Sequence, residues 1–172
     1  MRSLFFAILL ILLIIVVAII LYLYLIHYSP SQQPETTKTA VAALPDCDQT
    51  LWDHVYHPAR LRVIEECKIV TGTIVSIKAE KDGDLHIRLK PDEQFAGLLN
   101  QKNIEGQNGS LVLEPVCVDV VTQTDAADAC KGFQNKVTIP KVGMHVEVTG
   151  SYVLDQEHGW NEIHPVTRIK PV

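Results

Sequence analysis

The chain has 172 residues, of which 47% are hydrophobic and 20% charged, and its formal net charge is −5. Thirteen of its fifteen basic residues and nineteen of its twenty acidic residues lie after residue 45, so this part of the chain is clearly acidic. An acidic module is poorly suited to phosphate backbones, because such binding depends on neutralising phosphates with Lys and Arg. We therefore expect no nucleic-acid partner.

Residues 4–26 form an almost unbroken apolar run without a charged residue. As a helix, the run measures roughly 34 Å, which is enough to cross a bilayer core. A cleaved secretory signal has a shorter apolar region that ends at a small-residue site. The nearest such pattern, at Ala40 and Ala42, lies well downstream. Residues 1–27 are thus predicted to be an uncleaved transmembrane signal anchor.

The few charges near this run predict its orientation. Arg2 precedes the run, whereas the first basic residue after it is Lys38. The positive-inside tendency places the N-terminus in the cytoplasm and the rest of the chain outside it. We expect a single-pass protein of the cell membrane. Residues 28–45, rich in Pro, Ser, Thr and Gln, are predicted to be a flexible linker. Residues 46–172 are predicted to be one extracytoplasmic domain.

All four cysteines lie in this domain, and an even number outside the cytoplasm predicts two disulfides. Three pairings are possible, and the simplest joins neighbours, Cys47 with Cys67 and Cys117 with Cys130. The competing interpretation is a zinc site with four thiolates. It lacks the close cysteine pairs that such sites use.

Alternating apolar and polar residues predict five main strands. The strands cover residues 67–79, 85–90, 110–121, 143–154 and 160–169, with a small extra strand at 136–140. Gly72 and Gly150 interrupt two of the strands, where glycine often marks a bulge or a sharp bend. A helical turn is predicted at 92–100, followed by a polar loop at 101–109. A short helix is predicted at 122–132, between strands three and four.

This order of elements is the one that a five-stranded Greek-key OB barrel uses. The phrases VTGTIVSI and VEVTGSYV look like the glycine-bent strands of OB domains. Together with LWDHVYHPARLRVIEEC, DGDLHIRL and GSYVLDQEHGWNEIHPV, they resemble OB-fold-like domains of uncharacterised secreted or membrane-anchored proteins of prokaryotes. The resemblance implies a mainly β fold and a compartment, and it brings no catalytic residues.

Six of the seven histidines lie in the predicted domain. The most distinctive run is 158–165, in which Trp160 offers a stacking platform at the mouth of the barrel and Glu162 and His164 offer polar contacts. In the alternative interpretation, Trp160 closes the core and His164 bonds to the backbone. The candidate binding residues are Trp160, Glu162, His164, His158 and His86.

No metal site or cofactor is predicted, although imidazole and carboxylate ligands suit zinc. The alternative metal set is His145, Glu147 and His164, since period-two spacing puts two of these on one face of a strand. We expect a binding or interaction module for an envelope protein, peptide or glycan. One alternative is a metal-dependent hydrolase that uses some of His86, His145, His158, Glu162 and His164. Another is a structural envelope component, which would have no pocket.

Overall fold

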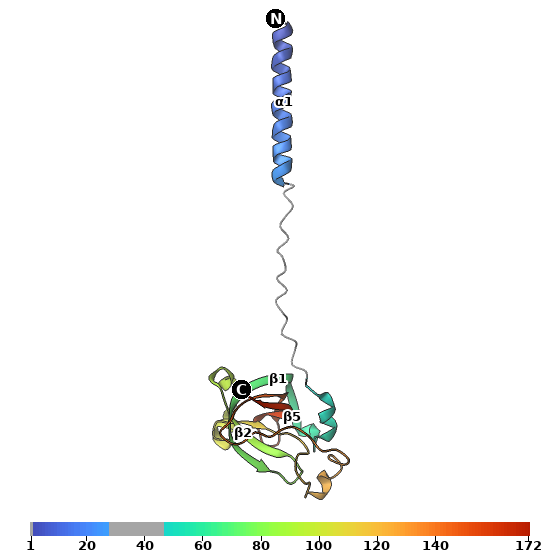
Figure 1. Ribbon diagram of the computed structural model, residues 1–172, viewed down its shortest axis with the longest axis vertical. Helices are drawn as coiled ribbons and strands as arrows, with labels where there is room; N and C mark the ends of the chain where they lie inside the picture. Colours follow the sequence, from blue (N-terminus) through green and yellow to red (C-terminus); the bar gives the residue numbers. More distant parts are fainter. Residues whose placement is uncertain (1, 28–46) are drawn as a thin grey trace. The chain divides into compact units, whose positions relative to one another are not determined.

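The structure of the protein is a computed structural model that describes residues 2–27 and 47–172 (Figure 1). The chain divides into an N-terminal unit and a β-rich unit. The first contains helix α1, Arg2–His27, which has no acidic residue in its first turn. Counting only the residues that the structure describes, no helix is long and apolar enough to cross a membrane. The linker predicted at 28–45 lies outside the described residues, so it stays a prediction.

The β-rich unit is built on five strands whose hydrogen bonds close into a ring. The strands are β1 (Leu61–Ala79), β2 (Leu85–Pro91), β3 (Leu111–Leu113), β4 (His145–Asp155) and β5 (Asn161–Pro171). The order around the ring is β1-β2-β3-β5-β4, and β4 returns to β1. All neighbours are antiparallel except β3 and β5, which are parallel. The mainly β prediction is confirmed.

Strand β1 bends, and one glycine lies at the point where it changes partner. Its first part pairs with β4 and its last part with β2, and Gly72 pairs with both. A Cβ atom at Gly72 would collide with the backbone of Lys90 and Pro91. At Gly150, where the register of β4 against β5 shifts, a Cβ would lie 2.5 Å from the Pro165 carbonyl oxygen. Both glycines therefore permit close strand approach, as the sequence predicts.

The helical segments differ from the prediction. The predicted loop at 101–109 begins with helix α2 (Gln101–Gly106), which is stabilised by a capping box between Asn100 and Asn103. The predicted helix at 122–132 is reduced to the single 3₁₀ turn η4 (Thr124–Ala126). The helix therefore lies between β2 and β3. The other 3₁₀ segments are η1 (Gln49–His54), η2 (Pro58–Arg60) and η3 (Glu93–Leu98), and the last confirms the turn expected at 92–100.

Two strand predictions were also too generous. Strand β3 stops at Leu113, two residues before Pro115, which has no backbone N–H to donate. The predicted strand at 136–140 does not form. Strand β1 begins at Leu61, six residues before the expected start, and its extra residues pair with the end of β4.

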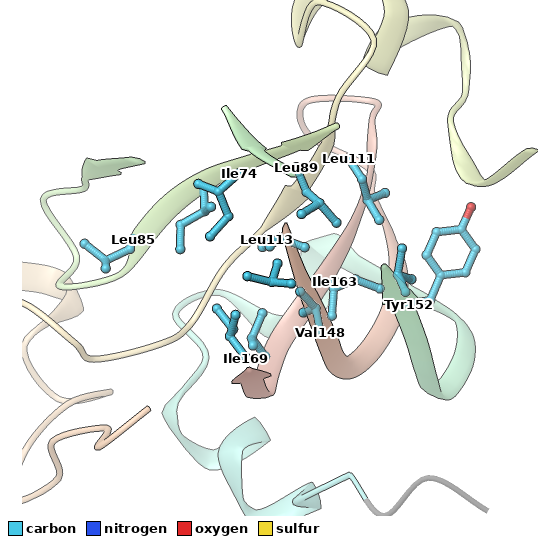
Figure 2. Close-up of a cluster of buried hydrophobic side chains, with 13 residues drawn as sticks. Ile74, Leu85, Leu89, Leu111, Leu113, Val148, Tyr152, Ile163 and Ile169 are labelled. Atoms are coloured by element: carbon cyan, nitrogen blue, oxygen red, sulfur yellow. The ribbon is translucent and has the colours of Figure 1, made fainter. Parts of the chain in front are cut away.

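The main core lies inside the ring of strands (Figure 2). Side chains from all five strands meet there, including Ile74, Leu89, Leu113, Val148 and Ile163, and all of these are fully buried. A second cluster joins η1 to the sheet through Leu51, Val55, Leu61, Val116 and Val153. The lead-in segment before β1 is thus packed against the sheet.

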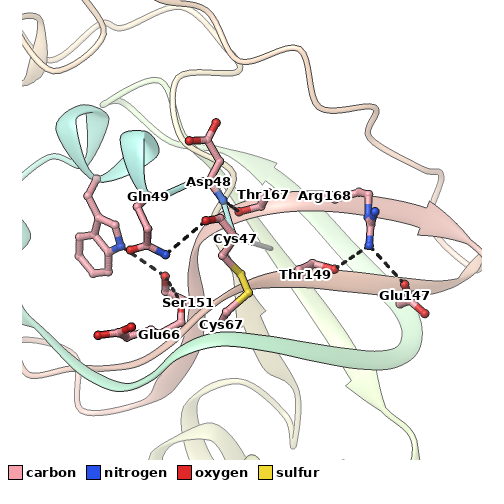
Figure 3. The surroundings of a disulfide bond; sticks show 11 residues. Cys47, Asp48, Gln49, Glu66, Cys67, Glu147, Thr149, Ser151, Thr167 and Arg168 are labelled. Carbon is pink, nitrogen blue, oxygen red and sulfur yellow. Dashed lines mark hydrogen bonds and ion pairs between the residues drawn. A yellow bond between two sulfur atoms is a disulfide. The ribbon is translucent and has the colours of Figure 1, made fainter. Parts of the chain in front are cut away.

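Both disulfides join neighbouring cysteines, as predicted. Cys47 is bonded to Cys67 in β1, and Cys117 is bonded to Cys130. Figure 3 shows the first bridge, beside which the Asp48 N–H donates to Thr167 Oγ1 at 3.1 Å. No cysteine is free, so the four-thiolate zinc interpretation is wrong. Loops of 13 and 20 residues should each contribute about 3 kcal/mol to stability.

Candidate functional site

A cluster of buried polar side chains lies at one end of the sheet, supplied by segments that are distant in the sequence. Asp84 precedes β2, Glu114 follows β3, and Glu162 and His164 lie on β5. Asp155 ends β4. The exposed fraction of each of these side chains is at most 10%. Burial of so many charged groups is costly unless they are paired and hydrogen-bonded, so their contacts decide what the cluster can do.

His164 is the centre of the cluster. Its Nδ1 lies 3.0 Å from Glu162 Oε1 and 3.0 Å from Glu114 Oε2. Burial works to lower the pKa of His164, but the bonds to Glu114 and Glu162 outweigh it and raise that pKa to about 10. In the metal-free protein the ring is therefore an imidazolium at neutral pH.

Glu114 accepts bonds from several cationic groups. Besides His164, it faces His86 Nδ1 at 3.2 Å and the Arg60 guanidinium at 3.7 Å. Burial alone would raise the pKa of Glu114, but the bonds from His164 and His86 hold it well below its usual range. His86 also contacts Gln107 Oε1 through Nε2, at 3.1 Å. Glu114 thus links the buried His164 to His86 and Arg60.

Glu162 and Asp84 differ from Glu114 in their surroundings. Burial, and then the charge of Glu114, raises the pKa of Glu162, whose Oε2 accepts the indole N–H of Trp160 at 3.0 Å. Asp84 Oδ1 accepts the backbone N–H of Cys117 at 2.8 Å. Burial raises the pKa of Asp84 to about 7. These two carboxyl groups therefore hold protons more tightly than usual.

Arg60 forms ion pairs with two carboxylates of the cluster, those of Asp155 and Glu114. Its guanidinium forms an ion pair with the fully buried Asp155. Burial works to lower the pKa of Arg60, but Asp155 and Glu114 raise it. Asp155 also accepts the backbone N–H groups of Glu157 and His158, at 2.8 and 3.1 Å, which fixes the turn between β4 and β5.

A cavity of about 600 Å³ opens above this cluster. It is lined by the β1–β2 turn, by β2 and by the β4–β5 turn, with Arg60, His86, Arg88, Glu114, His158 and Trp160 among its residues. A volume of this size is typical of a small-ligand site.

The predicted binding residues divide between the lining of this cavity and the cluster behind it. Trp160, His158 and His86 line the cavity, whereas Glu162 and His164 are fully buried. His158 stacks on Trp160 with ring centroids 4.4 Å apart and an interplanar angle of 10°. One face of the indole is thus already covered, and Glu162 and His164 act on a ligand only through other side chains.

The alternative metal set is not brought together. His145 Nε2 lies 3.0 Å from Asp92, and Glu147 pairs with Lys170 at 2.9 Å. Both side chains lie on the outer face of β4, whereas His164 points into the protein. Within the described part of the chain, the ligand-capable groups that gather are Asp84, Glu114 and His164, and Asp84 with Cys117 and Cys130. The latter sulfurs are bonded to each other, so that second group offers no thiolate.

Arg60, Asp84 and Glu114 were not predicted from the sequence to be site residues. One sequence feature could have identified Glu114: it is a charged residue that directly follows the apolar residues of β3, all of which are buried. A comparison with models of known protein families finds no match to the chain, and a search of curated proteins finds none either.

Proposed function

We propose that the protein is a single-pass membrane protein that presents an OB-like ligand-binding domain outside the cytoplasm. The apolar run at 4–26 supports the anchor, because its length as a helix suits a bilayer core. The two disulfides fit an oxidising compartment. The closed order β1-β2-β3-β5-β4, with β3 parallel to β5, fits a five-stranded Greek-key barrel.

The observation that carries the binding function is the position of the cavity. OB domains bind oligonucleotides and oligosaccharides on strands two and three and on the loops between strands one and two and strands four and five. The cavity here is lined by Asp82 from the β1–β2 turn, His86 from β2, and His158 from the β4–β5 turn. This position supports a binding function, because an OB architecture would bind its ligands there.

The ligand class follows from the charges around the cavity. Arg88 donates through Nε to Ser76 Oγ at 2.7 Å, and no carboxylate in the described part of the chain pairs with its guanidinium. Lys81 likewise has no carboxylate partner among the described residues. Arg88 and Lys81 therefore offer two cations without carboxylate partners. Together with Trp160 and Gln107, they suit a hydroxyl-rich ligand that carries an acidic group. The acidic charge of the domain disfavours a polyanion such as nucleic acid, so the ligand class we propose is an oligosaccharide that carries a single acidic group.

Binding of acidic and neutral oligosaccharides of equal length to the full chain in detergent tests this proposal, with saturation-transfer NMR as the measurement. Arg88→Gln should weaken binding of the acidic oligosaccharide roughly ten- to a hundredfold, because a hydrogen bond to a charged group contributes about 1.5–3 kcal/mol. The matched control is Arg62→Gln, an exposed arginine that does not line the cavity. Equal binding by both variants, or no preference for the acidic oligosaccharide, would overturn the assignment.

Membrane attachment is tested separately. The full chain should stay in the membrane fraction after alkaline carbonate extraction, and deletion of residues 4–26 should release it. A protease added outside intact cells should reach the domain. A full chain found in the soluble fraction would overturn the anchor without affecting the cavity.

A further inference from the structure

Two buried polar atoms in the cluster face each other without a hydrogen-bond partner. They are Asp84 Oδ2 and His164 Nε2, which lie 3.9 Å apart. The exposed fractions of the two side chains are 3% and 0%. Orphaned buried polar atoms are rare in folded proteins and each is costly. A single ion between these two atoms would give both of them a partner.

The ion pairs of the cluster leave one buried carboxyl group, that of Asp84, without a bonded cation. Four carboxyl groups are buried there, those of Asp84, Glu114, Asp155 and Glu162. The cations that contact them are Arg60, His164 and the half-buried His86. Arg60 is already committed to Asp155. The carboxyl group of Asp84 has no cation within hydrogen-bonding distance, because His164 Nε2 is too far away for a direct bond.

The distances suit a transition-metal ion. Bonds from zinc to imidazole nitrogen and carboxylate oxygen are about 2.0–2.1 Å, so two ligands of one ion lie up to roughly 4.1 Å apart. The 3.9 Å between Asp84 Oδ2 and His164 Nε2 is within that limit and longer than the roughly 3.4 Å of a tetrahedral pair, so binding would draw the two side chains together. Asp84, Glu114 and His164 each offer a ligand-capable atom within 4.8 Å of those of the other two, so Glu114 is the candidate for a third ligand.

The residues around His164 and Asp84 also hold these two side chains in place, as the neighbours of metal ligands usually do. A histidine ligand usually donates its second ring N–H to a carboxylate, which fixes the ring and raises its basicity. His164 Nδ1 makes this contact with Glu162 Oε1 at 3.0 Å, and Glu162 is in turn bonded by Trp160. Asp84 is held by the backbone N–H of Cys117.

We propose that Asp84, Glu114 and His164 bind one divalent transition-metal ion of the zinc class. His164 binds it through Nε2 and Asp84 through Oδ2, while Glu162 orients the ring. The site is separate from the predicted set of His145 and Glu147, and it does not depend on any ligand in the cavity above it. Since Nε2 must lose its proton to bind the ion, binding releases a proton to the buffer.

The test uses the full chain in detergent, stripped with a chelator and then titrated with ZnCl₂ by calorimetry. One equivalent should bind, and the heat should change with the ionisation enthalpy of the buffer because a proton is released. The melting temperature should rise with zinc concentration. Asp84→Asn should weaken zinc binding by more than the 10–100-fold that loss of an outer-shell partner costs. Asparagine keeps the Oδ1 that accepts the Cys117 N–H.

The matched control is His145→Ala, which removes a histidine bonded to Asp92 on the outer face of β4. This variant should bind zinc as the unaltered chain does. Cobalt(II) added to the unaltered chain keeps the test decisive if Asp84→Asn fails to fold. Saturable visible absorption at one equivalent supports the site. Absence of stoichiometric zinc and of these bands, or equal zinc affinity in a folded Asp84→Asn variant, would overturn it.

Discussion

The indole N–H of Trp160 donates to Glu162 Oε2 at 3.0 Å, and this bond joins a residue that lines the cavity to one that solvent does not reach. The other oxygen of the same carboxyl group contacts His164. A change at Trp160 can therefore reach His164 through one carboxyl group, that of Glu162.

Trp160→Phe should destabilise the protein by about 1–3 kcal/mol, because it leaves a buried carboxyl oxygen without its donor. The free energy of unfolding, measured with urea, checks this. Trp52→Phe is the matched control: it removes a longer bond, 3.3 Å, to the Ser151 hydroxyl. We expect it to cost less, about 0.5–1.5 kcal/mol. A larger loss at Trp52 would contradict the importance of the Glu162 contact.

Stability of the metal-free protein should fall as the pH rises above neutrality. The pKa of folded His164, about 10, lies above its ordinary value of 6.5, and that of Asp84, about 7, lies above 3.8. The folded protein holds both protons more tightly than the unfolded chain. Their stabilisation is therefore complete below the unfolded pKa and is lost as pH rises through the folded pKa.

Glu114 acts in the opposite direction. Its pKa is lowered in the folded protein, so its stabilisation is present above its ordinary value of 4.5 and is lost as the pH falls. Urea midpoints measured in excess chelator should thus be highest at about pH 4–5 and decline towards pH 9. A midpoint that rises between pH 6 and 9 would show that His164 is neutral in the fold.

Gly150→Ala should destabilise the protein by about 1–3 kcal/mol through overpacking. The new Cβ would lie 2.5 Å from both Ile163 Cγ2 and the Pro165 carbonyl oxygen. Gly97→Ala is the control, because no atom lies within 4 Å of the Cβ position there. Its melting temperature should stay near that of the unaltered chain. Equal melting temperatures for the two variants would mean that β4 and β5 separate easily at Gly150.

Each disulfide should contribute comparably to stability. Replacing Cys47 and Cys67 together with serine, or Cys117 and Cys130 together, should lower the free energy of unfolding by about 2–4 kcal/mol. A reductant should lower the melting temperature of the unaltered chain and leave a variant without both bridges unchanged. An unaltered chain that melts at the same temperature with and without reductant would contradict these contributions.

Local sequence patterns predicted the strands well because each has a physical cause that acts over a few residues. Alternation located β2 and β5, and Gly72 marked the point where β1 bends. The disulfide pairing followed from proximity along the chain. The position of the helix was not predicted. Asn100 and Asn103 form its capping box, but asparagine is also common in loops, so their presence did not indicate a helix.

The candidate site was harder to predict because it is assembled from distant segments. Period-two spacing correctly placed Glu162 and His164 on one face of β5, but it does not say which face points inward. A buried carboxylate–imidazole pair is tolerated only because Glu114 and Arg60 lie beside it, and neither is near it in sequence. The buried face was thus decided by tertiary contacts.

The bridge between Cys47 and Cys67 also determines how tension would enter the domain. The described part of the β-rich unit begins at Cys47, and its sulfur is bonded directly to a residue within β1. A pull on the tether from residue 46 would therefore load β1 at Cys67 and bypass the nineteen residues between the two cysteines. Those residues include Arg60, so a pull on the chain at Cys47 would leave this wall of the cavity unloaded as long as the bridge is oxidised.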